Sequence, residues 1–223
     1  MNITGLELPT RDLQAQRNFY ANILQLPAKL TSLGLEVKAG KTNIVFTQAS
    51  PDFDGAYHFA FNIPEHQFNA AKEWIASHIS LLRDESGKEE FKSETWNSDS
   101  VYFKDAAGNV LEFIARHNLK DAVDGDFDSQ QILQVSEIGL PSEDVVKFAN
   151  ELCTRLGLSV FMQQPNEAFT PVGDDNGLFI LPIKNRIWIP NSGVPAKLLP
   201  VKVKGEANGK RWEVRGVPYE ITC

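Results

Sequence analysis

Disulfide frameworks, membrane spans and export signals all lack support in this 223-residue chain. It has only two cysteines, Cys153 in a predicted helix and Cys223 at the last position, too few for a disulfide framework. No apolar run reaches the length of a membrane span. The first residues carry neither a basic region nor a long apolar segment, so we expect no signal peptide and a cytoplasmic location.

Basic clusters and nucleotide-binding motifs are missing as well. The net charge is -7 and no stretch of the chain gathers lysine and arginine, which excludes nucleic acid and anionic membrane as expected partners. The chain has no glycine-rich phosphate loop, no serine nucleophile elbow and no Cys/His zinc spacing. The hydrophobic share of 42% is that of an ordinary globular protein with one large domain or two small ones.

The stretch from Asp105 to Arg116 is the most informative part of the sequence. A turn with Gly108 at a position that favours positive φ leads into a short apolar strand. In that strand Glu112 shares a face with Val110 and Ile114. A carboxylate between buried apolar neighbours needs a partner, which could be a metal, a cation, a cluster of donors or a proton. Alternatively, Glu112 lies at a wet sheet edge or pairs with Arg116.

The order of predicted elements repeats along the first half. A strand at 3–9 and a helix at 13–24 are followed by strands at 27–38 and 43–48. The order restarts with a strand at 57–63 and a helix from 64 to 75, and the strands that follow are predicted at 80–83, 90–96, 99–104 and 109–115. We predict two β-α-β-β-β units within residues 1–118, followed by a polar linker at 119–131.

The second half, residues 132–223, contains a repeat of the first. Leu6-Glu-Leu-Pro-Thr-Arg-Asp-Leu13 returns as Ile138-Gly-Leu-Pro-Ser-Glu-Asp-Val145, which indicates repeated structural units. The third unit is predicted at 132–189, with strands at 159–163, 168–172 and 177–181. The fourth is truncated, with a strand at 200–204, a last pair of strands within 211–222 and no helix between them. This alignment sets Glu137 against Gly5, and Glu220 against Glu112.

These paired units resemble the vicinal oxygen chelate superfamily, which includes glyoxalase I, extradiol dioxygenases and the fosfomycin- and bleomycin-resistance proteins. The resemblance covers residues 1–117 well and 132–223 more loosely. The motifs that carry it are Leu8-Pro9 with Asp12-Leu13 and Phe19-Tyr20, His58-Phe-Ala-Phe61, and Phe103-Lys-Asp-Ala-Ala-Gly-Asn-Val-Leu-Glu-Phe113. It implies an α+β fold of tandem β-α-β-β-β modules with half-open, barrel-like sheets and a truncated last module.

The resemblance also implies a set of metal ligands. Metal-dependent members take one histidine from the first strand of one unit, a second from the first strand of the next, and a glutamate from that unit's last strand. By position, His58 matches the second histidine and Glu112 the glutamate, whereas the first histidine falls at Gly5 and is missing. Glyoxalase-like members add a carboxylate from the last strand of the first unit, where this chain has no acid and offers Gln48 or Asn43 instead.

The residues around these positions suggest a cavity. His58, Ala60 and Asn62 share the small, polar face of their strand, as expected for a surface that lines a ligand. Glu7 shares a face with Gly5 and could donate an oxygen or act as a base, although a structural surface acid is an alternative. We therefore predict His58 and Glu112 as metal ligands and Glu112 and Glu7 as catalytic carboxylates, with Asn62 and Gln48 in the substrate pocket. His58 and Glu112 could instead form a simple ion pair.

Three classes of function remain open from the sequence. The first is a divalent-metal-dependent glyoxalase, lyase or dioxygenase that uses Mn, Fe, Zn, Ni or Mg on a small substrate with two neighbouring oxygens. The second is a metal-free small-molecule binding protein of the bleomycin-resistance type, as the missing histidine at Gly5 suggests. The third is a structural or interaction protein. In the second half, Glu137 and Glu220 form an acid pair without an imidazole, which could be a second metal site or, alternatively, part of a degenerate, structural half. The chain is expected to be a monomer or a homodimer.

Overall fold

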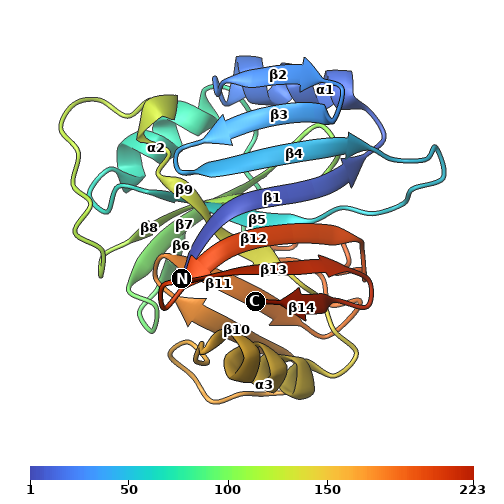
Figure 1. The fold of residues 1–223 in the computed structure, drawn as a ribbon. Helices are drawn as coiled ribbons and strands as arrows, with labels where there is room; N and C mark the ends of the chain where they lie inside the picture. Colours follow the sequence, from blue (N-terminus) through green and yellow to red (C-terminus); the bar gives the residue numbers. More distant parts are fainter.

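The computed structural model describes residues 1–223 and contains fourteen strands in two seven-stranded sheets. Three α-helices, a π-helical turn and a 3-10 turn complete it. In Figure 1 the blue and red strands of the first sheet lie in front of the teal, green and orange strands of the second. The α+β class expected from the sequence is confirmed.

Each sheet combines strands from both halves of the chain. The strands of the first sheet are β1 (Asn2–Thr10), β2 (Ala28–Thr31), β3 (Gly34–Ala39), β4 (Thr42–Gln48), β12 (Val201–Ala207), β13 (Lys210–Gly216) and β14 (Glu220–Thr222). The strands of the second sheet are β5 (His58–Ile63), β6 (Phe91–Ser93), β7 (Ser98–Lys104), β8 (Val110–Arg116), β9 (Gln134–Gly139), β10 (Phe169–Asp174) and β11 (Gly177–Pro182). Their orders are β14-β13-β12-β1-β4-β3-β2 and β10-β11-β9-β5-β8-β7-β6.

The repeated sequence motif forms the same strand-to-helix turn twice. The helical elements are α1 (Leu13–Asn18), η1 (Phe19–Ile23), α2 (Phe68–Ala76), η2 (Ser129–Gln131) and α3 (Val145–Leu156). The Asp12 carboxylate accepts from the backbone N–H of Ala15 at 2.8 Å, and Asp144 accepts from Lys147 at 3.0 Å. Both aspartates are therefore helix N-caps, which explains why the repeat keeps an aspartate at this spacing.

The pairing of the units determines where a site can form. The first unit joins the truncated fourth, because β1 runs antiparallel to β12 with Leu6 opposite Val203. The second unit joins the third, because β5 runs antiparallel to β9 with Ala60 opposite Glu137. The opening strands of two units thus lie side by side at the centre of each sheet. Figure 1 shows the consequence, since the N-terminal β1 lies beside the red C-terminal strands.

The two faces of β5 have different roles, as its alternation predicted. Phe59, Phe61 and Ile63 belong to a cluster of 45 buried residues that joins both sheets and the three helices. The opposite face of the second sheet carries a separate cluster of seven buried residues, which includes Tyr102 and Trp188. His58 faces this second cluster, because its ring lies 4.9 Å from that of Trp188.

Several predicted elements differ from the structure. The region predicted as strand at 27–38 contains β2 and β3, as a β-α-β-β-β unit requires, but the strand predicted at 159–163 is reduced to a single bridge between Val160 and Val172. Residues 80–83 form no strand, although the N–H of Leu82 donates to the carbonyl of Tyr102. The helix predicted from 13 to 24 changes at Phe19 into the π-helical turn. Local pattern identified these apolar segments but not the hydrogen-bonding partners that decide their form.

The segment predicted as a linker packs against α2. The Gln67 side chain donates to the carbonyl of Gly125 at 2.8 Å, and the Phe127 ring lies 5.6 Å from that of Trp74. The division of the chain at residues 119–131 stays a prediction. None of the helices combines the length and the apolar character that crossing a membrane requires.

Candidate functional site

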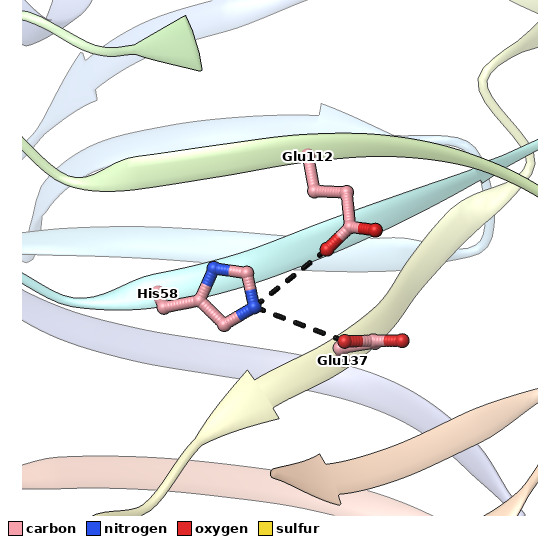
Figure 2. Close-up of side chains that lie close together, drawn as sticks. All are labelled: His58, Glu112 and Glu137. Atoms are coloured by element: carbon pink, nitrogen blue, oxygen red, sulfur yellow. Dashed lines mark ion pairs between the residues drawn. The ribbon is translucent and has the colours of Figure 1, made fainter. Parts of the chain in front are cut away.

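Three side chains from adjacent strands meet at the centre of the second sheet. His58 is the first residue of β5, Glu112 lies in the middle of β8, and Glu137 lies in β9. In the strand register Ala60 stands opposite both Glu112 and Glu137. Its methyl group leaves the space between the two carboxylates open, and His58, two residues earlier on the same face, reaches into that space (Figure 2).

The three groups face one another at distances that are too long for direct hydrogen bonds. His58 Nε2 lies 3.7 Å from an Oε2 of Glu112 and 3.8 Å from Oε2 of Glu137. One potential ligand atom from each residue lies within 4.8 Å of the other two. All three residues are buried, with exposed fractions of 6%, 3% and 2%. Figure 2 shows both carboxylates turned toward the imidazole.

The imidazole of His58 has a fixed orientation. Its Nδ1 lies 3.0 Å from the backbone carbonyl of Val110. Because a carbonyl oxygen can only accept, Nδ1 carries a proton and donates it, which leaves Nε2 to face the carboxylates. This is the arrangement that metal-binding histidines usually have, with one nitrogen held by a backbone acceptor and the other directed at the ion.

Glu137 uses its two oxygens in different directions. Oε1 accepts from Nη2 of Arg116, whose side chain is fully buried, while Oε2 faces His58. Arg116 also donates through Nε to the Asn62 side chain at 3.3 Å, and Asn62 in turn donates to the backbone carbonyl of Asp175. A buried network therefore holds Glu137 from behind.

Burial and charge shift the protonation of the group. Burial, and to a lesser degree the neighbouring Glu137, raise the pKa of Glu112 from 4.5 to about 7, against the opposing effect of His58. Burial alone would lower the pKa of His58, but the carboxylates of Glu137 and Glu112 outweigh burial and the pKa is raised. Glu112 is thus a carboxyl group that can exchange a proton near neutral pH.

A small cavity of about 50 Å³ adjoins the three residues. Besides the site itself, its lining residues are mostly apolar: Trp96, Tyr102, Phe169, Ile180, Pro182, Arg186, Ile187, Trp188 and Ile189. The last four belong to the segment 183–200, which we call the covering segment. It is held in place by backbone hydrogen bonds such as Trp188 N–H to the carbonyl of Val194, and by Lys104, which donates to the carbonyl of Ser192 at 2.8 Å.

The structure brings together two of the residues selected from the sequence and separates the others. His58 and Glu112 face each other as expected. Glu7 lies in the first sheet and pairs with Lys202 at 2.9 Å, so it does not join the group. Gln48 donates to the backbone carbonyl of Arg11 at the surface. Asn62 is buried but supports Arg116 instead of lining the cavity.

Glu137 is the residue whose role the sequence reasoning missed. It was matched with Glu220, but Glu220 lies at an exposed edge and pairs with Arg215 at 3.4 Å. The sequence pattern groups the first and second units within residues 1–118, whereas in the structure the second unit shares its sheet with the third. The repeat already aligned Glu137 with Gly5, the position of the missing histidine. Gly5 lies in the other sheet, so its lack of a side chain removes no ligand from this site.

The donor set fits a divalent metal ion. Metal bonds to nitrogen or oxygen of about 2.1 Å, at a tetrahedral angle, place two ligand atoms about 3.5 Å apart. The separations of 3.7 and 3.8 Å at His58 Nε2 are close to this value. One imidazole and two carboxylates form an oxygen-rich set, which suits Mn, Fe or Mg at least as well as Zn.

Comparison with known proteins supports the fold. No protein-family model and no curated protein match the chain. A Bacillus subtilis structure with a provisional dioxygenase name aligns with a TM-score of 0.60 and 16% identity over 82% of this chain, which spans 64% of that structure's length. A lactoylglutathione lyase from Agrobacterium tumefaciens (TM-score 0.40, 23% identity, 50% of this chain and 91% of that one) is similar only in part. A glyoxalase/bleomycin resistance protein/dioxygenase from Nocardioides is also similar only in part, with a TM-score of 0.42 and 18% identity over 57% of this chain and 89% of that one.

Of these structures, we use the Bacillus subtilis one as evidence, and at 16% identity it supports the fold alone. The two smaller structures are too weakly similar to support an argument. The tandem-module fold that the resemblance to the vicinal oxygen chelate superfamily implied is thereby confirmed.

Proposed function

We propose that this chain is a metal-dependent protein of the vicinal oxygen chelate type, which holds a divalent ion through His58, Glu112 and Glu137. The proposed activity is that of a lyase or dioxygenase acting on a small substrate with two neighbouring oxygens. The observation that carries the proposal is the convergence of three buried ligand atoms from three adjacent strands, at separations that suit a shared ion.

The residues of the site suggest how the chemistry is divided. A bound ion supplies a Lewis acid that polarises a substrate oxygen and stabilises the negative charge that develops on it. Glu112, whose pKa in the metal-free site is raised to about 7, is the carboxylate that we propose takes a proton from the substrate and returns it. His58 presents Nε2 in a fixed direction because Val110 holds Nδ1. Trp188, the buried aromatic residue of the covering segment, shields the same space from water.

The size of the cavity favours this proposal over a metal-free binding protein. Pockets for drug-sized ligands have volumes of roughly 300–1,000 Å³. The cavity beside His58 has about 50 Å³, which accommodates an ion and a few small atoms. An ion and the two oxygens of a small substrate need little of this volume, whereas a large metal-free ligand, like the body of any larger substrate, would require the covering segment to move away.

Metal content tests the proposal directly. Purified protein without a tag is incubated with Mn²⁺, Fe²⁺, Zn²⁺, Ni²⁺ or Mg²⁺, desalted and measured by elemental analysis. We expect one equivalent of an ion in the wild type and its loss in His58→Ala, Glu112→Ala and Glu137→Ala. Glu7→Ala is the matched control, since it removes a carboxylate from the other sheet and should keep the ion. A wild type that retains none of these ions would refute the proposal.

A further inference from the structure

This inference rests on the proposed function and concerns how the site works with a glutamate at the position where the resemblance implies a histidine. Glu137 occupies that position on the opening strand of the third unit. Replacing a neutral imidazole by a carboxylate adds one negative charge to a buried site. A metal site with His58 and two carboxylates would therefore be more negative than a site with two histidines and one glutamate.

A buried cation lies directly behind Glu137. Arg116 is the last residue of β8, on the same face as Glu112, and its side chain has no exposed surface. Its guanidinium lies over the rings of Trp96 and Phe161, at 5.6 and 5.8 Å from their centroids. Nη2 of Arg116 donates to Oε1 of Glu137, and this contact directs Oε2 of Glu137 toward His58.

We propose that Arg116 and Glu137 act together as the replacement for the missing histidine. Arg116 is a positioning residue: it fixes the carboxylate so that one oxygen is presented to the ion. It also restores the charge balance, because two carboxylates and one guanidinium sum to the same charge as one carboxylate with two neutral imidazoles. The metal ligand at this position is thus a pair of residues, of which only Glu137 touches the ion.

The hydrogen bonds of Arg116 distinguish this role from that of an ordinary structural ion pair. A buried ion pair that serves stability alone needs its remaining donors satisfied, because desolvation otherwise outweighs the attraction. Nη1 of Arg116 is buried without a hydrogen-bond partner, and Oδ1 of Asp175 lies 3.9 Å from it. Arg116 is therefore incompletely paired, and the contacts that it does make converge on Glu137 and on Asn62.

Metal affinity in four variants tests the pair. Binding of Mn²⁺ and of Zn²⁺ is measured by isothermal titration calorimetry for wild type, Arg116→Met, Glu137→His and the double variant that carries both changes. We expect Arg116→Met to weaken binding about 10- to 100-fold, as is usual when a residue that orients a metal ligand is lost. Glu137→His alone leaves the guanidinium buried without its carboxylate and should also bind more weakly. The double variant has the two-histidine charge and should recover most of the wild-type affinity.

The outcomes separate this inference from the proposed function. A wild type that binds neither ion refutes the proposed function itself. A wild type that binds, together with an Arg116→Met variant of equal affinity, refutes the role of Arg116. A folded double variant that binds no more tightly than Glu137→His also refutes it. If Arg116→Met fails to fold by circular dichroism, the charge-matched double variant decides alone, and Arg215→Met, which removes an exposed arginine, is the control for loss of a positive charge.

Discussion

Replacing Glu112 by glutamine should change how the stability of the metal-free protein depends on pH. Glutamine has the shape of a protonated glutamate but cannot ionise. In the wild type Glu112 is buried, and its pKa rises from 4.5 to about 7 because the ionised form is poorly solvated and lies close to Glu137. The folded protein therefore retains a proton that the unfolded chain has already released.

The direction of the effect follows from this difference in proton binding. Between pH 4.5 and about 7 the folded state binds more protons than the unfolded state, so the free energy of unfolding falls as the pH rises. Each pKa unit corresponds to about 1.4 kcal/mol, and the interval from 4.5 to about 7 gives roughly 3 kcal/mol. The raised pKa of His58 acts in the same direction, since its contribution to stability is lost as the pH rises through that pKa.

Urea unfolding with EDTA present, followed by tryptophan fluorescence, measures this prediction. At pH 5 wild type and Glu112→Gln should have similar stability, and at pH 8 the variant should be more stable by about 3 kcal/mol. Glu220→Gln removes an exposed carboxylate and should follow the wild type at every pH. If the curves of wild type and Glu112→Gln run parallel from pH 5 to 8, burial does not penalise the ionised Glu112 and its proposed role in proton transfer loses its basis.

Three further substitutions test the packing that positions the site. Trp188→Ala should destabilise the protein by about 3 kcal/mol in urea unfolding, because it empties a buried aromatic position, and unchanged stability would show that the covering segment is not packed as described. Gly139→Val should displace Trp188, since a Cβ at Gly139 would lie 2.5 Å from its ring, and a red shift in fluorescence that Trp188→Phe abolishes would show this. Asp105→Ala should cost about 3 kcal/mol in thermal unfolding, because the donors of Gln16 and Tyr20 lose their buried acceptor, and a loss as small as that of a surface substitution would contradict it.

The sequence allowed the local part of the site to be predicted. The alternation of β5 correctly separated His58 from the buried Phe59 and Phe61, and the turn before β8 correctly placed Gly108, whose φ is +81°. The repeat correctly identified the segment Ile138–Val145 as a second copy of Leu6–Leu13, with the same strand-to-helix turn. These features depend on residues close together in the chain, whose side-chain directions follow from the strand period alone.

The rest of the site could not be predicted because it depends on which strands become neighbours. Glu137 is 25 positions from Glu112 in the sequence, and only the pairing of β5 with β9 brings the two together. Arg116 was considered as a partner for Glu112 but pairs with Glu137 for the same reason. The covering segment has no regular pattern, so neither its path over the cavity nor the contact between Trp188 and His58 could be derived from periodicity.

The two sheets together explain why one of them carries the candidate site and the other does not. In the first sheet β1 takes the place of β5, and the register gives the residues that correspond to His58, Glu112 and Glu137. These are Gly5, Val45 and Lys202. In place of Ala60, which leaves space between two carboxylates, the first sheet has Glu7, and Glu7 pairs with Lys202 at 2.9 Å. A lysine and a glutamate from the chain itself thus satisfy each other there, whereas in the second sheet Arg116 pairs with only one of the two carboxylates, and the Oε2 atoms of both face His58, where we propose that the ion binds.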